Sequence, residues 1–390
     1  MSPNKGDPLI TFAHGQSASG ARSRISLDAI FGRIVALSDN GRLLSGLMVR
    51  TEQGAYWVRA SSSLNRFTRA GPGRRARAVK RIEGNGMWFY LNGRFVEDAE
   101  ATVPVTDHSF LYGDGCFEGI GVCNGRVLHL DEHVERMFKS ARMLRIAMPV
   151  SPAELHDLIL ETASRNGMAE SKTGYLRPLV SRGSGPLGLK YSNKLGKARL
   201  VIIPQIGDRR IAYTGEIESF TAVFSSYQRP GPSSLDARIK ANNYLTYILA
   251  YLEAQDRGAD IAIMRDPEGY VAEGHAMNLF AVHGERVVVP QESLALSGIT
   301  RKHVIATTRR IGIECVESNL TRYDIVAADE VFVTSSLEAV ASVRSIDGEA
   351  MPDPIPGPIT RKIRDAYIKF ALDTGTPVPT ASPQLRKALG

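Results

Sequence analysis

Lys240 is the residue in this sequence whose surroundings most favour covalent chemistry. It lies between a strand-like stretch, residues 220–226, and a helical apolar pattern that begins near Tyr244. Burial between two such elements disfavours the charged form of an amine, and a neutral amine forms Schiff bases with aldehyde cofactors. Most lysines at such positions are solvated, so Lys240 indicates this chemistry only if other groups of a site accompany it.

Two segments would bind an anion beside such a lysine. Residues 297–300 (Ser-Gly-Ile-Thr) precede a predicted helix, whose free backbone N–H groups and Thr300 hydroxyl would form an anion site. Thr334, Ser335 and Ser336 follow an apolar strand and offer hydroxyls and turn amides. Each pattern taken alone is equally typical of an ordinary helix cap or turn.

Arg136 and Glu273 add one charge of each sign. Arg136 lies on a predicted helix one turn from His133, and an inward guanidinium would bind phosphate through two hydrogen bonds. Glu273 lies in an apolar strand-like stretch, where a buried carboxylate requires a cationic partner. A protonated pyridine nitrogen would be such a partner. Alternation along the strand also allows Glu273 to face solvent.

The elements that must position these residues begin after residue 86. Ser151, Pro152 and Glu154 predict the start of a helix with a capping box. Other helices are expected at 131–145, 241–256 and 300–311, and strands at 88–91, 94–96, 175–180, 199–204, 220–226, 261–264, 279–282, 287–289 and 330–333. The polar segment 205–215 is predicted to connect two mixed α/β domains, 87–207 and 208–390, with a cleft between them.

Charge is distributed unevenly along the chain. Residues 1–86 carry 14 Lys/Arg against 5 Asp/Glu, a net charge of +9, whereas the remaining 304 carry 34 against 36, a net charge of −2. We interpret 1–86 as a basic extension that the core chemistry does not require, and nucleic-acid or partner binding there would be compatible with catalysis elsewhere. The catalytic body gives no reason to expect a nucleic-acid or membrane surface.

Composition indicates a globular cytoplasmic protein. No apolar run approaches the roughly 20 residues that span a bilayer. The three cysteines, Cys116, Cys123 and Cys315, have no metal-ligand spacing, so no metal is expected. They cannot all pair with one another, which favours a reducing compartment.

Taken in order, these segments resemble the class IV aminotransferases, the pyridoxal-phosphate enzymes of fold type IV. The resemblance extends from about Trp88 to about Lys369. Its densest parts are residues 107–120, 130–136, 240–245, 271–278 and 298–301. It implies a two-domain mixed α/β fold, a pyridoxal 5'-phosphate cofactor and aminotransferase activity.

The resemblance also implies a role for each candidate cofactor residue. Lys240 would bind the cofactor covalently and then move the proton between substrate and cofactor. Glu273 would keep the pyridine nitrogen protonated, and Tyr244 would hydrogen-bond the phenolic oxygen. The ring would pack on Leu296, and the phosphate would be held by Arg136, Ile299, Thr300, Ser335 and Ser336.

Within the family, the branched-chain amino acid aminotransferases are the most similar. Tyr175 and Arg177 resemble their Tyr-Ile-Arg element, which helps to hold substrate carboxylates, and Tyr112 and Phe117 correspond to aromatic residues of their side-chain pocket. Leu337 departs from the alanine that many of them have in a turn whose amides bind the substrate carboxylate. Gly121 replaces a familiar arginine, and Asn242 and Asn243 replace glycines. These departures leave the substrate less determined than the cofactor.

The function that the resemblance implies is amino-group transfer between branched-chain L-amino acids (Leu, Ile, Val) and 2-oxoglutarate. Two half-reactions at one site would give ping-pong kinetics, in a homodimer or higher homo-oligomer. Aminodeoxychorismate lyase and D-amino acid aminotransferase, both of the same fold, remain alternatives. Residues 186–189, Pro-Leu-Gly-Leu, argue against the D-specific enzymes, which have an arginine and a histidine in that region. A non-enzymatic binding protein would be expected to lack Lys240 or Glu273.

Overall fold

The chain forms two compact units, residues 1–78 and 79–390. The structure is a computed structural model that describes residues 37–39, 42–44, 46–51, 54–59, 86–171, 173–206, 213 and 215–380. In the first unit, two antiparallel hairpins are described: β1 (Leu37–Asp39) with β2 (Arg42–Leu44), and β3 (Gly46–Thr51) with β4 (Gly54–Arg59). Five of the basic residues of the extension, Arg74, Arg75, Arg77, Lys80 and Arg81, lie outside the described residues.

The described residues of the second unit form two sheets. The first has the order β21-β9-β8-β10-β11-β5-β6, with β7 paired to β10. Its strands are β5 (Trp88–Leu91), β6 (Arg94–Glu97), β7 (Gly115–Phe117), β8 (Ile120–Cys123), β9 (Arg126–Val127), β10 (Thr173–Ser181), β11 (Arg199–Ile206) and β21 (Thr376–Pro377). The helices of this part are η3 (Asp98–Glu100), α1 (His108–Tyr112), α2 (Leu130–Met143), α3 (Pro152–Arg165) and η4 (Leu189–Tyr191).

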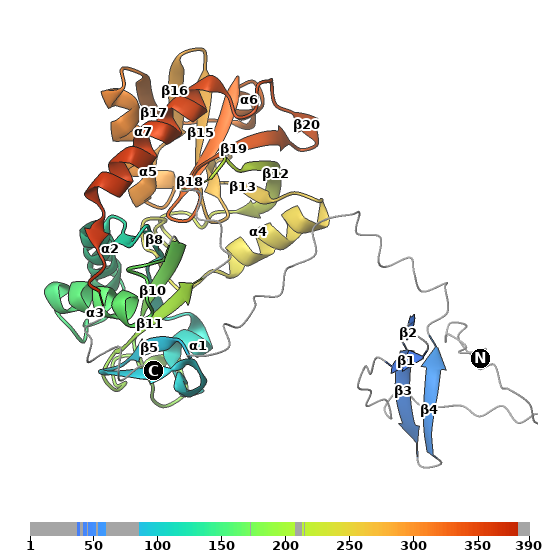
Figure 1. Cartoon of the computed structure of the whole chain (residues 1–390), viewed down its shortest axis with the longest axis vertical. Helices are drawn as coiled ribbons and strands as arrows, with labels where there is room; N and C mark the ends of the chain where they lie inside the picture. The colour runs from blue at the N-terminus through green and yellow to red at the C-terminus, as the bar shows by residue number, and fades with distance from the viewer. Residues whose placement is uncertain are drawn as a thin grey trace, which may run out of the picture. The chain divides into compact units, whose positions relative to one another are not determined.

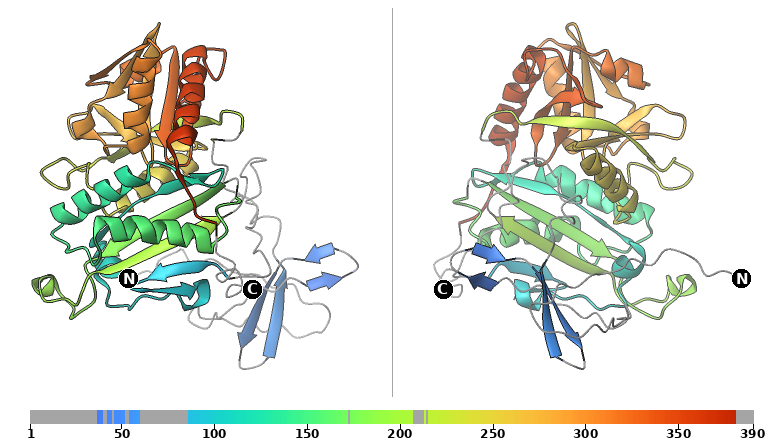
Figure 2. Two further views of the ribbon diagram at one scale, coloured as in Figure 1. Left: turned by 60° about the vertical axis from the view of Figure 1, so that its left-hand side comes forward. Right: turned by 90° about the vertical axis from the view of Figure 1, so that its right-hand side faces the viewer.

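Helices α2 and α3 lie across one face of the first sheet (Figure 2). The capping box predicted for α3 is confirmed, because the Ser151 hydroxyl accepts from the Glu154 N–H and the Glu154 carboxylate accepts from the Ser151 N–H. The two helices bury Leu130, Met137 and Ile159 in one apolar cluster with strand residues. This packing fixes the face of α2 that points toward the site.

The second sheet has the order β14-β13-β12-β19-β18-β15-β16-β17, with β20 paired to β19. Its strands are β12 (Ser219–Gln228), β13 (Ile261–Arg265), β14 (Val271–Gly274), β15 (Asn278–His283), β16 (Arg286–Pro290), β17 (Glu314–Ser318), β18 (Glu330–Ser335), β19 (Ala339–Ile346) and β20 (Glu349–Ala350). The helices are α4 (Leu245–Asp256), η5 (Glu292–Leu294), α5 (Ile299–Arg310), α6 (Arg322–Val326) and α7 (Pro358–Thr374). Helices α5 and α7 pack side by side against this sheet (Figure 1).

The sequence predicted most of these elements but placed the start of α4 too early. The helix begins at Leu245 rather than at residue 241, because the backbone before it pairs with β7. The Phe117 N–H donates to the Lys240 carbonyl at 3.0 Å, and the Asn242 N–H donates to the Gly115 carbonyl at 2.9 Å. Strand β19 and helix α7 were not anticipated. Most of the predicted connection at 205–215, including the domain boundary at 207/208, lies outside the described residues.

Among the helices that the structure describes, none is both long enough and apolar enough to cross a membrane.

Candidate active site

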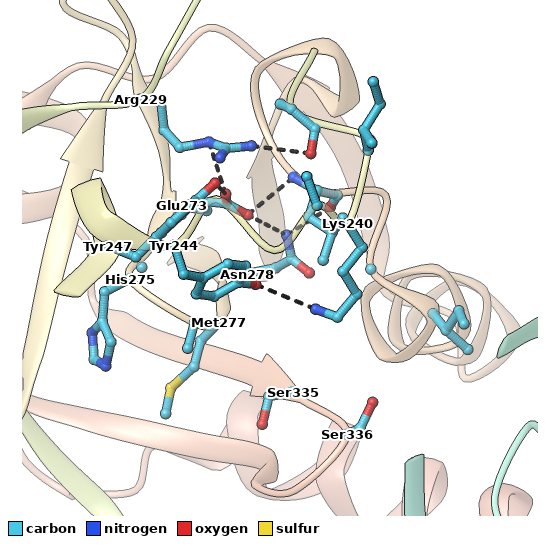
Figure 3. A pocket seen from close by; sticks show the side chains of 18 of the residues that line it. Arg229, Lys240, Tyr244, Tyr247, Glu273, His275, Met277, Asn278, Ser335 and Ser336 are labelled. Atoms are coloured by element: carbon cyan, nitrogen blue, oxygen red, sulfur yellow. Dashed lines mark hydrogen bonds and ion pairs between the residues drawn. The ribbon is translucent and has the colours of Figure 1, made fainter. Parts of the chain in front are cut away.

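One pocket collects the predicted chemistry (Figure 3). It contains about 760 Å³ of empty space, including its open mouth. All nine residues predicted to bind the cofactor line it: Arg136, Lys240, Tyr244, Glu273, Leu296, Ile299, Thr300, Ser335 and Ser336. They come from α2, from the segment before α4, from β14, from the start of α5 and from the end of β18, so the fold gathers positions that lie far apart in the sequence.

Lys240 is held by its backbone rather than by a helix. Its carbonyl accepts from the Phe117 N–H of β7, and its own N–H donates to the Ser140 hydroxyl at 3.2 Å. A Cβ atom at Gly115 would collide with the Asn242 side-chain amide and with the Val180 carbonyl, so only glycine allows this close approach. Asn242, one of the departures from the family pattern, donates to the Ser109 hydroxyl at 2.6 Å. The amine of Lys240 is left to project into the pocket, 3.5 Å from the Tyr244 hydroxyl.

Glu273 is buried on β14, with 4% of its surface exposed. One carboxylate oxygen accepts from the Leu296 N–H at 3.0 Å and lies 3.5 Å from the Asn278 amide. The other oxygen lies 2.9 Å from the Arg229 Nε and 3.5 Å from the Tyr247 hydroxyl. Burial raises the pKa of Glu273 above its ordinary value, and the Arg229 charge opposes that rise more than any other group does.

Arg136 points inward from α2, as the phosphate hypothesis requires. Its Nε and Nη2 donate to the two oxygens of Glu118 at 2.8 and 2.7 Å, and its Nη1 donates to the Ser297 carbonyl at 2.7 Å. A guanidinium has five N–H donors, so two remain for a ligand. Glu118 is fully buried and also contacts His133 Nδ1 at 2.7 Å. Burial alone would raise the pKa of Glu118, but the charge and hydrogen bonds of Arg136 and His133 outweigh it and hold that pKa well below the usual range.

Helix α5 begins at the pocket with Ile299 and Thr300. Its N-cap, Gly298, provides no side-chain hydrogen bond, and the first N–H groups of any helix have no partner within the helix. A Cβ atom at residue 298 would collide with the Asn278 side chain, so glycine is required here. With Arg136 in the same pocket, this helix start offers the free N–H groups and the positive charge that an anion site requires.

The predicted substrate residues lie outside the lining of this pocket. None of Tyr112, Phe117, Tyr175, Arg177 and Leu337 is among the described residues that line this pocket. Phe117 lies beside it, with its ring centroid 5.1 Å from that of Tyr244 and 4.9 Å from the Lys240 amine. Arg177 lies 4.9 Å from the same ring and donates to the Tyr175 hydroxyl at 3.0 and 3.2 Å. These three residues therefore form a group next to Lys240.

Tyr112 and Leu337 contact other parts of the structure. Tyr112 is 37% exposed, and its hydroxyl accepts from the Gly188 N–H at 3.3 Å. The Leu337 side chain packs on an apolar cluster of the second sheet and α7, so its extra bulk relative to alanine is accommodated there. Gly121 faces the same turn, where a Cβ atom would lie 2.7 Å from the Ser336 carbonyl. The glycine that replaces the familiar arginine thus lets the turn approach β8.

Sequence reasoning gave no role to two charged groups of the site, Arg229 and Glu118. Glu118 stood in an apolar run that becomes β7 and β8, and a carboxylate buried in such a run needs a cation. That signal was available in the sequence. Arg229 precedes Pro230 shortly after a predicted strand, and nothing local indicates that it turns toward Glu273.

Comparison with protein families matches residues 115–346 to "Amino-transferase class IV". A "putative branched-chain-amino-acid aminotransferase" of Methanocaldococcus jannaschii is 37% identical over 287 residues, which cover 72% of this chain and 95% of that protein. The chain belongs to the class IV aminotransferases. As a class IV aminotransferase it has the mixed α/β fold type IV architecture, and both the recognition and the fold class expected from the sequence are confirmed.

Solved structures give the same result for this aminotransferase. The branched-chain aminotransferase of Thermoproteus uzoniensis, solved with norvaline, has a TM-score of 0.67 and 34% identity, covering 74% of this chain and 95% of that one. A second branched-chain amino acid aminotransferase, solved with N-(5'-phosphopyridoxyl)-L-glutamate, has a TM-score of 0.68 and 30% identity, covering 77% of this chain and 97% of that one. That second relative carries a pyridoxal-phosphate derivative joined to an amino acid.

Proposed function

We propose that this protein is a pyridoxal-phosphate-dependent branched-chain L-amino acid aminotransferase that uses 2-oxoglutarate as the amino acceptor. The observation that carries the proposal is the placement of the Lys240 amine and the Glu273 carboxylate in one pocket, with Arg136 and the start of α5 at its edge. These groups fit the cofactor: an amine for the aldehyde, a buried carboxylate for the ring nitrogen, and cationic and N–H donors for the phosphate.

When bound, pyridoxal phosphate supplies an aldehyde and an electron-withdrawing ring. Lys240 would attach to it and, once released, carry a proton to and from the substrate α-carbon. Tyr244, 3.5 Å from that amine, would hydrogen-bond the ring oxygen. Glu273 would hold the ring nitrogen, and Leu296 would pack on the ring face. The phosphate would be bound by Arg136, Ile299, Thr300, Ser335 and Ser336.

The substrate assignment rests on the group beside Lys240. The apolar face of Phe117 suits a branched side chain, whereas the Arg177 guanidinium 4.9 Å from the same ring suits the distal carboxylate of glutamate. One site can therefore accept both amino donors in turn, which gives ping-pong kinetics. The names of the relatives support this substrate class, and a "branched-chain-amino-acid aminotransferase" of Escherichia coli (strain K12) is 33% identical over 298 residues, 74% of this chain and 93% of that protein.

We further propose a cytoplasmic homodimer or larger homo-oligomer. Leu245, Ile248 and Leu252 recur at helical spacing on α4 and are 67%, 51% and 48% exposed, an apolar stripe that a second copy would cover. The three buried free cysteines are compatible with a reducing compartment. Light scattering on an Ile248→Asp variant would test the stripe, because a charge in a subunit interface should yield monomers.

A half-reaction screen tests the proposed function. The purified protein with bound cofactor is mixed in turn with L-leucine, L-isoleucine, L-valine, D-alanine and aminodeoxychorismate, and loss of the visible cofactor band is followed. Rapid bleaching by the three branched-chain L-amino acids, reversed by 2-oxoglutarate, is expected. Bleaching by D-alanine alone, or pyruvate release from aminodeoxychorismate, would replace the proposal with one of the two alternatives.

A further inference from the structure

Arg229 is the first residue after β12, and its guanidinium is buried in the wall of the pocket. The residue is 5% exposed. Its backbone N–H donates to the Arg265 carbonyl at 2.8 Å, and its Nη2 donates to the Ala237 carbonyl at 3.0 Å. The guanidinium carbon lies 4.9 Å from the Tyr247 ring centroid. Burial of a charge is costly unless the charge is paired, so its partner indicates its purpose.

That partner is the carboxylate of Glu273. The Arg229 Nε lies 2.9 Å from the Glu273 Oε1, as an ion pair rather than as an aligned hydrogen bond. In Figure 3 the Arg229 guanidinium lies above the carboxylate, and the Lys240 amine lies below it. The contact therefore leaves the pocket face of Glu273 accessible while supplying a fixed positive charge behind it.

The Arg229 charge matters because Glu273 must hydrogen-bond the protonated ring nitrogen of the cofactor without accepting its proton. A carboxylate in a buried site prefers to be neutral, and burial does raise the pKa of Glu273. Two protonation states would then compete: carboxylate with protonated nitrogen, or carboxylic acid with neutral nitrogen. The first makes the ring a strong electron acceptor, and the second does not. A permanent cation in contact with the carboxylate favours the first.

The other titratable or charged groups near Glu273 do not replace Arg229. Tyr247 of α4 and Asn278 of β15 are neutral donors at 3.5 Å. Burial lowers the pKa of His275 to about 4, so this pocket histidine is neutral at physiological pH. Arg301 of α5 binds the Pro290 carbonyl and Glu317. Lys240 would be attached to the cofactor, so its amine is not a fixed charge beside Glu273.

We propose that Arg229 is a positioning residue that keeps Glu273 ionised, so that the proton shared between Glu273 and the cofactor ring resides on the ring nitrogen. If the positive charge is removed, that proton moves to the carboxylate oxygen, leaving a neutral acid facing a neutral ring nitrogen. The inference rests on the proposed function, because it requires a pyridine ring beside Glu273.

The test compares Arg229→Met, which has no charge, with Arg229→Lys, which keeps it. The holoenzyme is reconstituted with cofactor labelled with ¹⁵N in the ring, and the ring nitrogen signal is recorded at neutral pH. We expect a protonated-nitrogen shift in the wild type and in Arg229→Lys, and a shift toward the neutral nitrogen in Arg229→Met. A protonated nitrogen in Arg229→Met would overturn the inference while leaving the proposed function intact.

A second readout uses the full chain before cofactor is added. Infrared difference spectra against Glu273→Gln isolate the carboxyl band of Glu273, and Arg229→Met should raise its midpoint of ionisation by at least about one pH unit. An unchanged midpoint would contradict the inference. If the midpoint shifts but the protein takes up no cofactor, Arg229 still keeps Glu273 ionised, whereas the proposed function and the ring-nitrogen part of the inference both fail.

Arg364→Met is the matched control. Arg364 is similarly buried at 8% exposure, but it lies on α7 and donates to the Gly215 carbonyl, away from the pocket. Its substitution should lower stability without moving either signal. If Arg229→Met does not fold, Arg229→Gln, which is polar but uncharged, provides the same comparison of charge.

Discussion

The residues proposed to bind the cofactor and those proposed to bind the substrate are held differently. The cofactor residues are held by buried ion pairs and backbone bonds, as in Arg136 with Glu118 and in Lys240 with β7. The side chains proposed to bind substrate contact neutral groups instead: Arg177 donates twice to the Tyr175 hydroxyl, and Tyr112 is partly exposed. Rigid groups suit a cofactor that never changes. A looser group suits a site that must accept a branched side chain and a carboxylate in turn.

The comparison predicts that changes on the cofactor side abolish chemistry or folding, whereas changes on the substrate side alter the choice of substrate. Lys240→Ala is the strongest case. Turnover should fall by more than about 10⁴-fold, because both the covalent attachment and the proton carrier are lost. The control is Lys139→Ala, which removes an exposed lysine and should leave steady-state kinetics unchanged. Substantial turnover by Lys240→Ala would show that Lys240 neither attaches the cofactor nor carries the proton.

Glu118→Gln tests the buried network behind Arg136. Removing one member of a buried charge pair costs about 3–5 kcal/mol, so urea unfolding should show a loss of this order, together with weaker phosphate binding. Glu135→Gln removes an acidic residue from the same helix that is exposed and pairs with Lys139, and it should produce no measurable change. Equal effects of the two substitutions would mean that the buried ion pair contributes nothing to stability or to phosphate binding.

Arg177→Gln tests the substrate side. Losing a charge-assisted bond of about 1.5–3 kcal/mol should slow the half-reactions with glutamate and 2-oxoglutarate by about 10- to 100-fold. The L-leucine half-reaction, which presents no distal carboxylate, should change much less and is the internal control. Equal slowing of both substrates would show that Arg177 supports the cofactor instead.

The smallest expected effect is the pH dependence of stability. Because the folded pKa of Glu118 lies below its ordinary value, its stabilisation is fully present above the unfolded pKa, about 4.3, and is lost as the pH falls toward the folded value. The stability difference between the wild type and Glu118→Gln should therefore narrow below about pH 4. A constant difference across this range would argue that packing, not charge, stabilises the site.

Local rules and the family resemblance predicted different parts of the molecule. The α3 capping box involves Ser151 and Glu154 alone, so the sequence was sufficient to predict it. The gathering of Lys240, Glu273 and Arg136 came from the resemblance. The pairs Arg136–Glu118 and Arg229–Glu273 depend on how distant segments meet, and no local pattern encodes them. The late start of α4 has the same origin, since pairing with β7 outweighs the helical pattern after Lys240.

The most direct test of the account is to locate the covalent attachment. The protein with bound cofactor is reduced with borohydride, digested, and its peptides are mapped by mass spectrometry. A single phosphopyridoxyl adduct on Lys240 is expected, absent from Lys240→Ala and unchanged in Lys139→Ala. An adduct on another lysine, or none in a protein that shows the visible cofactor band, would contradict it.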